Sequence, residues 1–442
     1  MAPMERRSFL ASLALLGASA SLPRMSVAAA GWRAGAASVV ITPADALWMA
    51  GYARRIHPAR GAAMPLHAKA LALEGGGRRA VLVTVDLLGV TGQLTGHVLA
   101  GVAARFGLRP ADLILNASHT HSGPVVDDQL SVAYDLAPED RAAIARYSRG
   151  LVPALIELVG SALGALQPAE LAYATGTASF GVNRRTPGGP VDPTVPVLRV
   201  TRGERLLAVV FGYACHNTTL QHEMLQYHGD YAGVAQATLE ARHPGATALY
   251  VAGCGADINP HPRGTLEHVE AHGRTLGEVV DGTLQRAAPI DPALETRHRM
   301  VNLPFADAET RAAWHRGLKL EPVHLERHAR LMDDIIARDG RLPTEQAAPL
   351  HVWRLGRDLT FAAIGGEVVV DYALRLAADY PDRRIWAAGY SSDVFGYLPS
   401  ERVLREGGYE GADAMIYYGR PGPFAAGVEA LVHEGIRSLV TS

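Results

Sequence analysis

Lysine and cysteine are scarce in this chain of 442 residues. Its 42 basic residues include only two lysines, Lys69 and Lys319, and the sequence has no G-x-x-x-x-G-K-[ST] phosphate loop and no S-x-x-K motif. It also lacks G-x-S-x-G, which argues against the serine nucleophile of an ordinary α/β-hydrolase. No run of about 18 apolar residues is present, so no transmembrane helix is expected.

A strong charge of either sign is absent as well. The net charge is −2, from 42 basic and 44 acidic residues, so nothing indicates a nucleic-acid partner. Apolar residues make up 48% and charged residues 19% of the chain, which is typical of a globular protein. At roughly 150 residues per domain the length allows three domains, or one large α/β domain with additions.

The first thirty residues have the pattern of an export signal. Arg6-Arg7 is followed by a short apolar stretch and by small residues that end at Ala30. The arginine pair before Phe9-Leu10 favours the twin-arginine type over an ordinary secretory signal. We therefore expect residues 1–30 to be removed and residues 31–442 to form an exported protein, periplasmic or secreted, that touches a membrane surface at most transiently.

The two cysteines allow two interpretations. Cys215 and Cys254 are the only cysteines of the chain. An exported protein can join such a pair in a disulfide, and two small buried side chains are the equal alternative.

Short apolar, β-branched runs recur along the chain and stop at polar clusters. They predict strands near residues 80–85, 113–115, 206–211, 248–251, 359–364 and 385–387. Helical patterns occupy about 92–106, 138–165, 232–242, 265–287, 307–339 and 368–378. Strands that are apolar on both faces need cover on both sides, which predicts an α/β fold with central mixed β-sheets flanked by helices.

Several of these strands end at residues that can bind a metal. His119-Thr120-His121 follows one strand, His216 follows another, and Glu367 comes directly after Gly365-Gly366 at the end of a third. Ligands of α/β folds bind at the carboxyl ends of strands, so we expect one shared site. Two histidines and one glutamate make an open zinc shell. Taken singly, His216 could be a hydrogen-bonded core histidine and Glu367 a carboxylate in the first turn of a helix.

At this point the sequence resembles the neutral/alkaline ceramidases. The main motif is His119-Thr120-His121-Ser122-Gly123-Pro124 after Asn116-Ala117-Ser118. The other motifs follow in the family's order, at residues 41–43, 51–53, 66–70, 83–87, 183–185, 215–218, 229–233, 255–260, 396–397 and 409–412. The resemblance extends over about residues 34–425.

The resemblance implies a zinc ion held by two histidines, a glutamate and a tyrosine. The matching positions are His119, His216, Glu367 and Tyr397. It also implies that the enzyme hydrolyses the amide of an N-acyl sphingoid base, with His121, Arg184 and Tyr409 in the active site. His121 would carry a proton to the leaving amine, and Arg184 and Tyr409 would stabilise the oxyanion or hold substrate hydroxyls.

The sequence departs from the family in one motif. The family's Gly-Asp-Val-Ser-Pro is Ala256-Asp257-Ile258-Asn259-Pro260 here. Its Gly-rich, Pro-closed turn is expected to bring Asp257 and Asn259 to the substrate. Asparagine cannot act as an alkoxide nucleophile, so this chain needs a metal-activated water.

Three functions fit these observations. A ceramidase-like zinc amidohydrolase is favoured over a hydrolase of another cell-envelope amide or ester. A catalytically silent metal-binding relative is the third, which the complete metal shell disfavours. The immunoglobulin-like domain of longer family members is not expected after residue 442.

Overall fold

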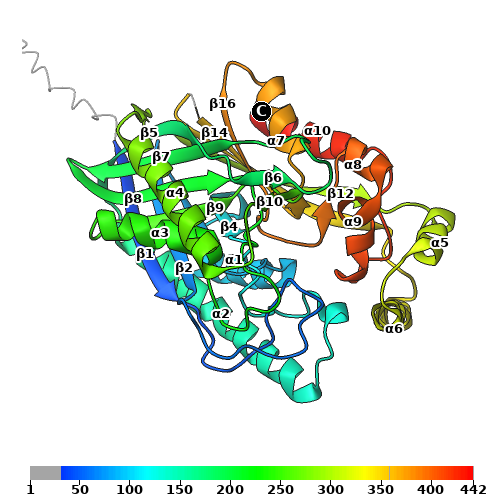
Figure 1. Ribbon diagram of the computed structural model, residues 1–442. Helices are drawn as coiled ribbons and strands as arrows, with labels where there is room; N and C mark the ends of the chain where they lie inside the picture. Colours follow the sequence, from blue (N-terminus) through cyan, green and yellow to red (C-terminus); the bar gives the residue numbers. More distant parts are fainter. Residues whose placement is uncertain (1–30, 358, 442) are drawn as a thin grey trace, which may run out of the picture.

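The computed structural model describes residues 31–357 and 359–441 (Figure 1). The predicted export signal, residues 1–30, therefore lies outside the described residues. Two β-sheets pack against each other through one apolar layer, and further apolar layers join the outer face of each sheet to helices. The predicted α/β class, with mixed sheets flanked by helices, is confirmed.

The larger sheet has nine strands and is mixed. Its order is β4-β3-β2-β1-β5-β7-β8-β9, with β11 paired to β5; the β3–β4 and β8–β9 pairs are parallel and the others are antiparallel. Its strands are β1 (Trp32–Val40), β2 (His67–Gly75), β3 (Arg78–Val85), β4 (Leu113–Ala117), β5 (Gln167–Thr177), β7 (Thr194–Arg202), β8 (Arg205–Tyr213), β9 (Thr247–Ala252) and β11 (Ala288–Pro289).

The second sheet has four strands in the order β12-β13-β14-β16, of which β14 and β16 are parallel. They are β12 (Leu294–Pro304), β13 (Glu345–Leu355), β14 (Leu359–Ile364) and β16 (Arg384–Ala388). Two strand pairs complete the β-structure: β6 (Gly181–Asn183) with β10 (Ile258–Pro260), and β15 (Glu367–Val368) with β17 (Tyr397–Leu398).

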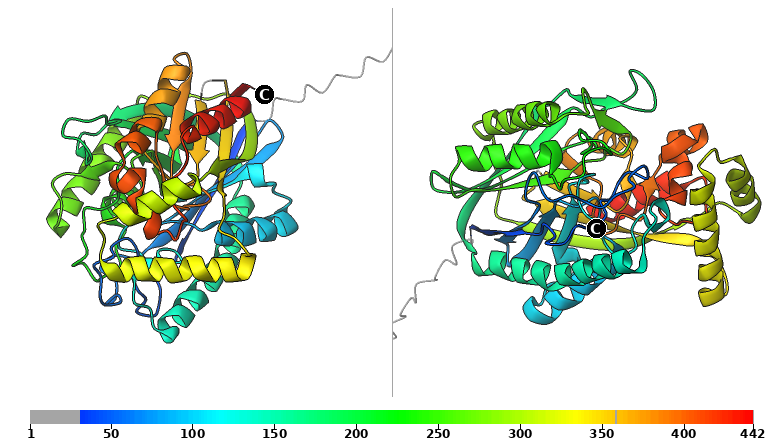
Figure 2. Two further views of the ribbon diagram at one scale, coloured as in Figure 1. Left: turned by 90° about the vertical axis from the view of Figure 1, so that its right-hand side faces the viewer. Right: turned by 60° about the horizontal axis from the view of Figure 1, so that its bottom comes forward.

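Helices cover both outer faces (Figures 1 and 2). The larger sheet is covered by α1 (Gly92–Phe106), α2 (Pro138–Gly164), α3 (Asp230–Arg242) and α4 (Leu266–Leu284), and the smaller by α7 (Asp371–Asp379) and α10 (Val428–Thr441). The remaining helical elements are α5 (Ala308–Gly317), α6 (Pro322–Asp339), α8 (Glu401–Glu406), α9 (Gly408–Gly411), η1 (Pro110–Asp112), η2 (Ser131–Ala133) and η3 (Asp413–Ile416).

Strand β8 shows why the predicted strands are apolar throughout. Val209 and Phe211 lie in the core on the helix side, whereas Ala208 and Val210 lie in the layer between the sheets. Successive side chains of a strand point to opposite faces, and here both faces are buried. All six predicted strands are present for this reason.

One helix prediction is wrong in its extent. The pattern over 307–339 forms two helices, α5 and α6, instead of one. Helix α5 ends at Gly317, and α6 begins with Pro322, whose ring fits the first turn of a helix and not its interior. Both helices lie at one edge of the molecule (Figure 1). Among the described residues no helix combines the length and the apolar character that crossing a bilayer would need.

The edge strands of the larger sheet approach each other. The Ala252 N–H of β9 donates a 2.9 Å hydrogen bond to the side-chain oxygen of Asn116 in β4, and the Asn116 amide donates to Gly389 O at 2.8 Å. One buried side chain therefore joins both edges of the larger sheet to the segment after β16. The ends of these strands consequently lie close together.

Packing of α2 on β1 depends on a glycine. A Cβ on Gly35 would lie 2.3 Å from the carbonyl oxygen of Ala162, whereas a Cβ on Gly96 in α1 would meet no atom within 4 Å. We expect Gly35→Ala to lower the free energy of unfolding by about 1–3 kcal/mol because α2 must shift. Gly96→Ala should raise it by about 0.5–1 kcal/mol because glycine costs entropy inside a helix. Denaturant unfolding of both variants tests this, and shifts of the same sign would contradict it.

Candidate metal centre

Four segments far apart in sequence meet at the ends of strands. His119 follows β4 and His216 follows β8, whereas Glu367 and Tyr397 begin the paired strands β15 and β17 and lie directly opposite each other. His119, His216, Glu367 and Tyr397 are each no more than 3% exposed. The structure therefore brings together the four side chains that the sequence predicted as one site.

The backbone at His119 explains how a pair two residues apart can face one point. His119 has a φ of 60°, in the left-handed region that non-glycine residues rarely adopt. The chain thus leaves the pleat after β4, and the Nε2 atoms of His119 and His121 lie 3.1 Å apart. Strain of this kind is typical of functional sites.

Three ligand atoms form a close triangle. His119 Nε2 lies 3.2 Å from His216 Nε2, and Glu367 Oε2 lies 3.1 Å and 3.3 Å from these two nitrogens. The Tyr397 hydroxyl is 3.4 Å from His216 Nε2. A tetrahedral metal with bonds of about 2.1 Å separates neighbouring ligands by about 3.4 Å, so this spacing fits one ion.

The ring hydrogens of His119 and His216 are directed at backbone carbonyls outside the triangle. His119 Nδ1 lies 2.6 Å from Leu88 O, and His216 Nδ1 lies 3.0 Å from Gly255 O. A carbonyl only accepts, so each Nδ1 carries the hydrogen and each Nε2 presents a lone pair.

Glu367 Oε2 is buried and has no hydrogen-bond partner. Two lone pairs and a carboxylate oxygen therefore face one another with no hydrogen between them. A cation satisfies such an arrangement, and neutral imidazoles with a carboxylate are ligands that zinc accepts.

His121 is the third imidazole of the cluster. The ligand atoms of His119, His121 and His216 all lie within 4.8 Å of one another, so these histidines could also hold a metal ion together. His121 Nδ1 has no hydrogen-bond partner, which leaves its tautomer open. A Cβ on Gly51, where φ is +104°, would lie 2.3 Å from that nitrogen, so only glycine leaves room for the ring.

Burial and neighbouring charges favour the neutral form of two imidazoles, those of His216 and His121. Burial, with the field of Arg184 next, lowers the pKa of His216 to about 4. Burial and the adjacent His119 and His216 also lower the pKa of His121.

Arg184 directly follows β6, and its side chain contacts three groups of the site. Its Nη2 donates to the Tyr397 hydroxyl at 2.8 Å, its Nε donates to Glu410 at 2.6 Å, and its Nη1 donates to Asn259 Oδ1 at 3.4 Å. Glu410 also accepts from Arg185 at 2.6 Å. Glu410, to which the sequence analysis gave no role, thus holds Arg184 against Tyr397.

The remaining predicted residues differ in their surroundings. The Tyr409 ring lies 5.4 Å from that of Tyr397 and is 43% exposed, so it is available to a ligand. Asn259 Oδ1 also accepts from Thr218 at 3.5 Å. Asp257 is fully buried, and its two oxygens accept from Val370 N at 2.9 Å and Asn183 Nδ2 at 3.1 Å. The carboxylate of Asp257 therefore joins three segments of the protein, and its contact with substrate stays a prediction.

Tyr418 is a second residue of the site that the sequence analysis missed, after Glu410. Its hydroxyl donates a hydrogen bond to Glu367 Oε1. Neither spacing nor local composition distinguishes Tyr418 from its neighbour Tyr417, so only the packing of the segment after η3 reveals it.

A cavity of about 240 Å³ opens onto the cluster. It is lined by Gly51, Tyr52, Ala53, Arg54, Leu88, His121, Leu130, Ala133, Glu367, Tyr397, Tyr409, Tyr417 and Tyr418. The lining thus combines apolar side chains, tyrosines and residues of the metal centre, as expected of a substrate site.

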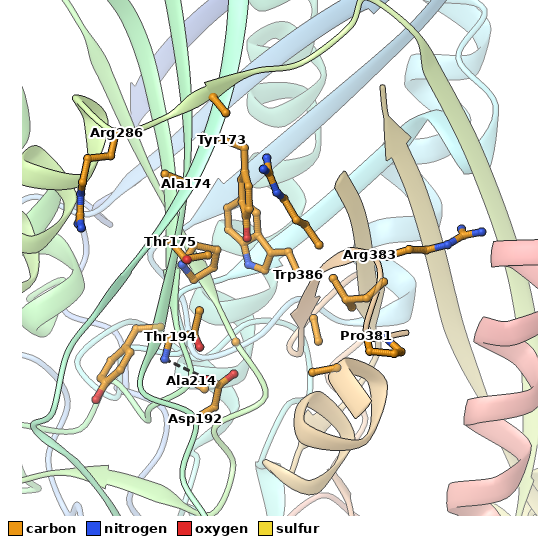
Figure 3. Close-up of a pocket in the computed structure, with 18 residues that line it drawn as sticks. Tyr173, Ala174, Thr175, Asp192, Thr194, Ala214, Arg286, Pro381, Arg383 and Trp386 are labelled. Atoms are coloured by element: carbon orange, nitrogen blue, oxygen red, sulfur yellow. Dashed lines mark hydrogen bonds between the residues drawn. The ribbon is translucent and has the colours of Figure 1, made fainter. Parts of the chain in front are cut away.

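A larger cavity of about 570 Å³ lies elsewhere, between the ends of β5 and β7 and strand β16 (Figure 3). Arg286 and Arg383 lie on opposite sides of it and point away from its centre (Figure 3). None of the residues of the metal centre lines it. The position of the metal-binding residues therefore favours the smaller cavity as the substrate site.

Cys215 and Cys254 are both buried free thiols, which supports the interpretation of this pair as two small buried side chains without a disulfide.

Comparison with known proteins gives consistent results. Residues 32–256 match the family model described as neutral/alkaline non-lysosomal ceramidase, N-terminal. A neutral ceramidase of Mycobacterium tuberculosis is 25% identical over 258 residues, a match that covers 54% of this chain and 38% of the relative. The sequence match thus spans well under half of that protein.

Solved structures show the same fold over most of the chain. The neutral ceramidase of Pseudomonas aeruginosa superposes with a TM-score of 0.71 at 19% identity, over 91% of this chain and 73% of that one. A structure described as a ceramidase complexed with C2 gives a TM-score of 0.70 at 18% identity, over 91% and 74%.

Removal of one imidazole should remove the metal. We expect His119→Ala and His216→Ala to weaken divalent-metal affinity by more than the roughly 10–100-fold that loss of an outer-shell partner costs. His97→Ala, on the exposed face of α1, is the matched control and should bind normally. Zinc titration with a competing chelator measures all three, and unchanged affinity in His216→Ala would refute the centre.

Proposed function

This chain belongs to the neutral/alkaline non-lysosomal ceramidase family, and we propose that it is a zinc-dependent amidohydrolase that cleaves an N-acyl amide of the ceramide type. The observation that carries the proposal is the triangle of His119 Nε2, His216 Nε2 and Glu367 Oε2, which face one another without a shared hydrogen. Residues 31–442 would act as one catalytic domain, since the ligands come from both halves of the chain.

His119, His216, Glu367 and Tyr397 would hold the zinc. When bound there, zinc supplies a Lewis acid that polarises an acyl carbonyl and makes water a nucleophile at neutral pH. Glu367 and Tyr397 begin two parallel paired strands, so the backbone keeps them next to each other. The Leu88 and Gly255 carbonyls orient the two imidazole ligands.

His121 is the proposed proton carrier. Hydrolysis forms a bond between the water oxygen and the acyl carbon and breaks the bond to nitrogen, and the amine leaves only after it gains a proton. His121 lines the cavity, and its Nε2 lies 3.1 Å from His119 Nε2, at the reacting end. It can take the proton from water and give it to the amine.

Arg184 and Tyr409 would stabilise the negative charge that develops on the acyl oxygen. The Arg184 guanidinium is held by Glu410 and donates to the Tyr397 hydroxyl, so it is oriented before substrate binds. Tyr409 contributes an exposed ring and hydroxyl at the cavity. Donors fixed in advance need no reorganisation when charge develops.

Asn259 and the size of the cavity favour a second candidate, a hydrolase of another amide or ester. A cavity of about 240 Å³ is smaller than the roughly 300–1,000 Å³ of sites that enclose a drug-sized ligand. The long acyl chains of a lipid substrate would therefore lie outside the cavity.

We further infer that residues 1–30 direct export and that the substrate is a lipid or small molecule of the cell envelope.

The test is a hydrolysis screen of zinc-reconstituted protein over N-acyl amides that include ceramides. We expect release of free amine, its loss on chelation and its recovery with zinc. His121→Ala should keep the zinc and lower turnover by about 10²–10⁴-fold, the usual contribution of a general acid or base. Loss of zinc in His121→Ala would instead make His121 a ligand, and a zinc-bound protein inactive on all amides would refute the proposal.

Asn259 should select the substrate without forming a bond to it. We expect Asn259→Ser to change the relative kcat/KM of two N-acyl substrates roughly 10–100-fold, because one buried polar contact contributes about 1–3 kcal/mol. Asn259→Ala should keep measurable turnover and full zinc content. Complete inactivity of Asn259→Ala with zinc bound would show that this position takes part in the chemistry.

A further inference from the structure

The two oxygens of Glu367 have different surroundings. Oε2 points at the triangle, 3.1 Å from His119 Nε2 and 3.3 Å from His216 Nε2. Oε1 points away from it and accepts the hydrogen of the Tyr418 hydroxyl. The carboxylate is 2% exposed, so water does not compete freely for either oxygen.

The segment that carries Tyr418 is braced on two sides. Arg420 Nε donates to Phe395 O at 2.8 Å, which ties the segment to the residues before β17. His328 Nε2 of α6 lies 2.8 Å from Arg420 O. A Cβ on Gly419 would lie 2.6 Å from Leu331 Cδ2, so the glycine allows α6 to approach. The Tyr418 hydroxyl therefore reaches Glu367 from a fixed position.

A carboxylate can bind a metal through one oxygen or through both. Binding through both uses a further coordination position, and catalytic zinc sites keep such a position open for water or substrate. A hydrogen-bond donor on the second oxygen opposes this change because it occupies a lone pair that the metal would use. In the described part of the chain, the Tyr418 hydroxyl is the partner of Oε1.

We propose that Tyr418 is a positioning residue that holds Glu367 as a one-oxygen ligand and thereby keeps a coordination position open. This inference rests on the proposed metal function. Tyr418 also lines the cavity, and its ring lies 6.3 Å from that of Tyr397, so one side chain contacts both the ligand set and the substrate space. Helices α5 and α6 lie between β12 and β13 in the chain. His328 of α6 helps to hold the segment that carries Tyr418, because it contacts Arg420 O.

The matched control is the neighbouring residue. Tyr417 lines the same cavity, is also half-buried and precedes Tyr418 directly. No contact of its hydroxyl with Glu367 is found in the described structure. Tyr418→Phe and Tyr417→Phe each remove one oxygen atom, so their difference isolates the hydrogen bond to Glu367.

The experiment replaces zinc by Co²⁺, whose visible absorption is strong with four ligands and weaker with five or six. We expect Tyr418→Phe to change this absorption because the second Glu367 oxygen enters the coordination shell, whereas the absorption of Tyr417→Phe should match that of the natural chain. In the zinc form Tyr418→Phe should lose about 10–100-fold in metal affinity or turnover. Thermal unfolding of the metal-free chain should be the same for both variants.

An unchanged Co²⁺ spectrum in Tyr418→Phe, or the same change in Tyr417→Phe, would overturn the role of Tyr418 and leave the metal centre standing. A natural chain that takes up neither Co²⁺ nor Zn²⁺ would overturn the metal centre itself. A metal-free Tyr418→Phe chain that unfolds at a much lower temperature would show a structural role instead of a positioning one.

Discussion

The structure is arranged around three acceptor atoms that cannot satisfy one another. His119 Nε2, His216 Nε2 and Glu367 Oε2 lie within 3.3 Å, and the imidazole hydrogens are already given to the Leu88 and Gly255 carbonyls. Burying lone pairs in this way costs free energy unless a cation joins them. The surrounding packing must therefore hold the three atoms in place without a metal, and a cation that bound them would stabilise the folded chain.

That requirement explains the unusual closure of the larger sheet. The histidines follow β4 and β8, which are separated in the sheet by five other strands, and only the curl of the sheet brings their ends together. Asn116 fixes this curl because it accepts from β9 and donates to the segment after β16. The second sheet then adds Glu367 and Tyr397 through the small pair β15–β17. Neither sheet contains the whole site.

The arginines beside the site are paired with a carboxylate. Arg184 lies partly buried beside two tyrosines, and Glu410 compensates its charge while Arg185 binds the other oxygen of the same carboxylate. Breaking such a pair leaves an uncompensated buried charge. Tyr418 carries no charge, but its hydroxyl donates a hydrogen bond to Glu367 Oε1, the oxygen that does not face the imidazoles.

Local chemistry alone determined a large part of this protein. Continuous apolar runs predict strands buried on both faces, and the histidines and Glu367 stand at strand ends in any fold built from those strands. Helix ends were less predictable, because the break between α5 and α6 needs only one glycine and one proline in an otherwise helical pattern. Tertiary structure alone decided which nitrogen of each imidazole faces the centre, that both oxygens of Asp257 bind the protein, and that Tyr418 and not Tyr417 reaches Glu367. Those outcomes depend on hydrogen-bond directions between segments far apart in the chain, and sequence spacing carries no information about direction.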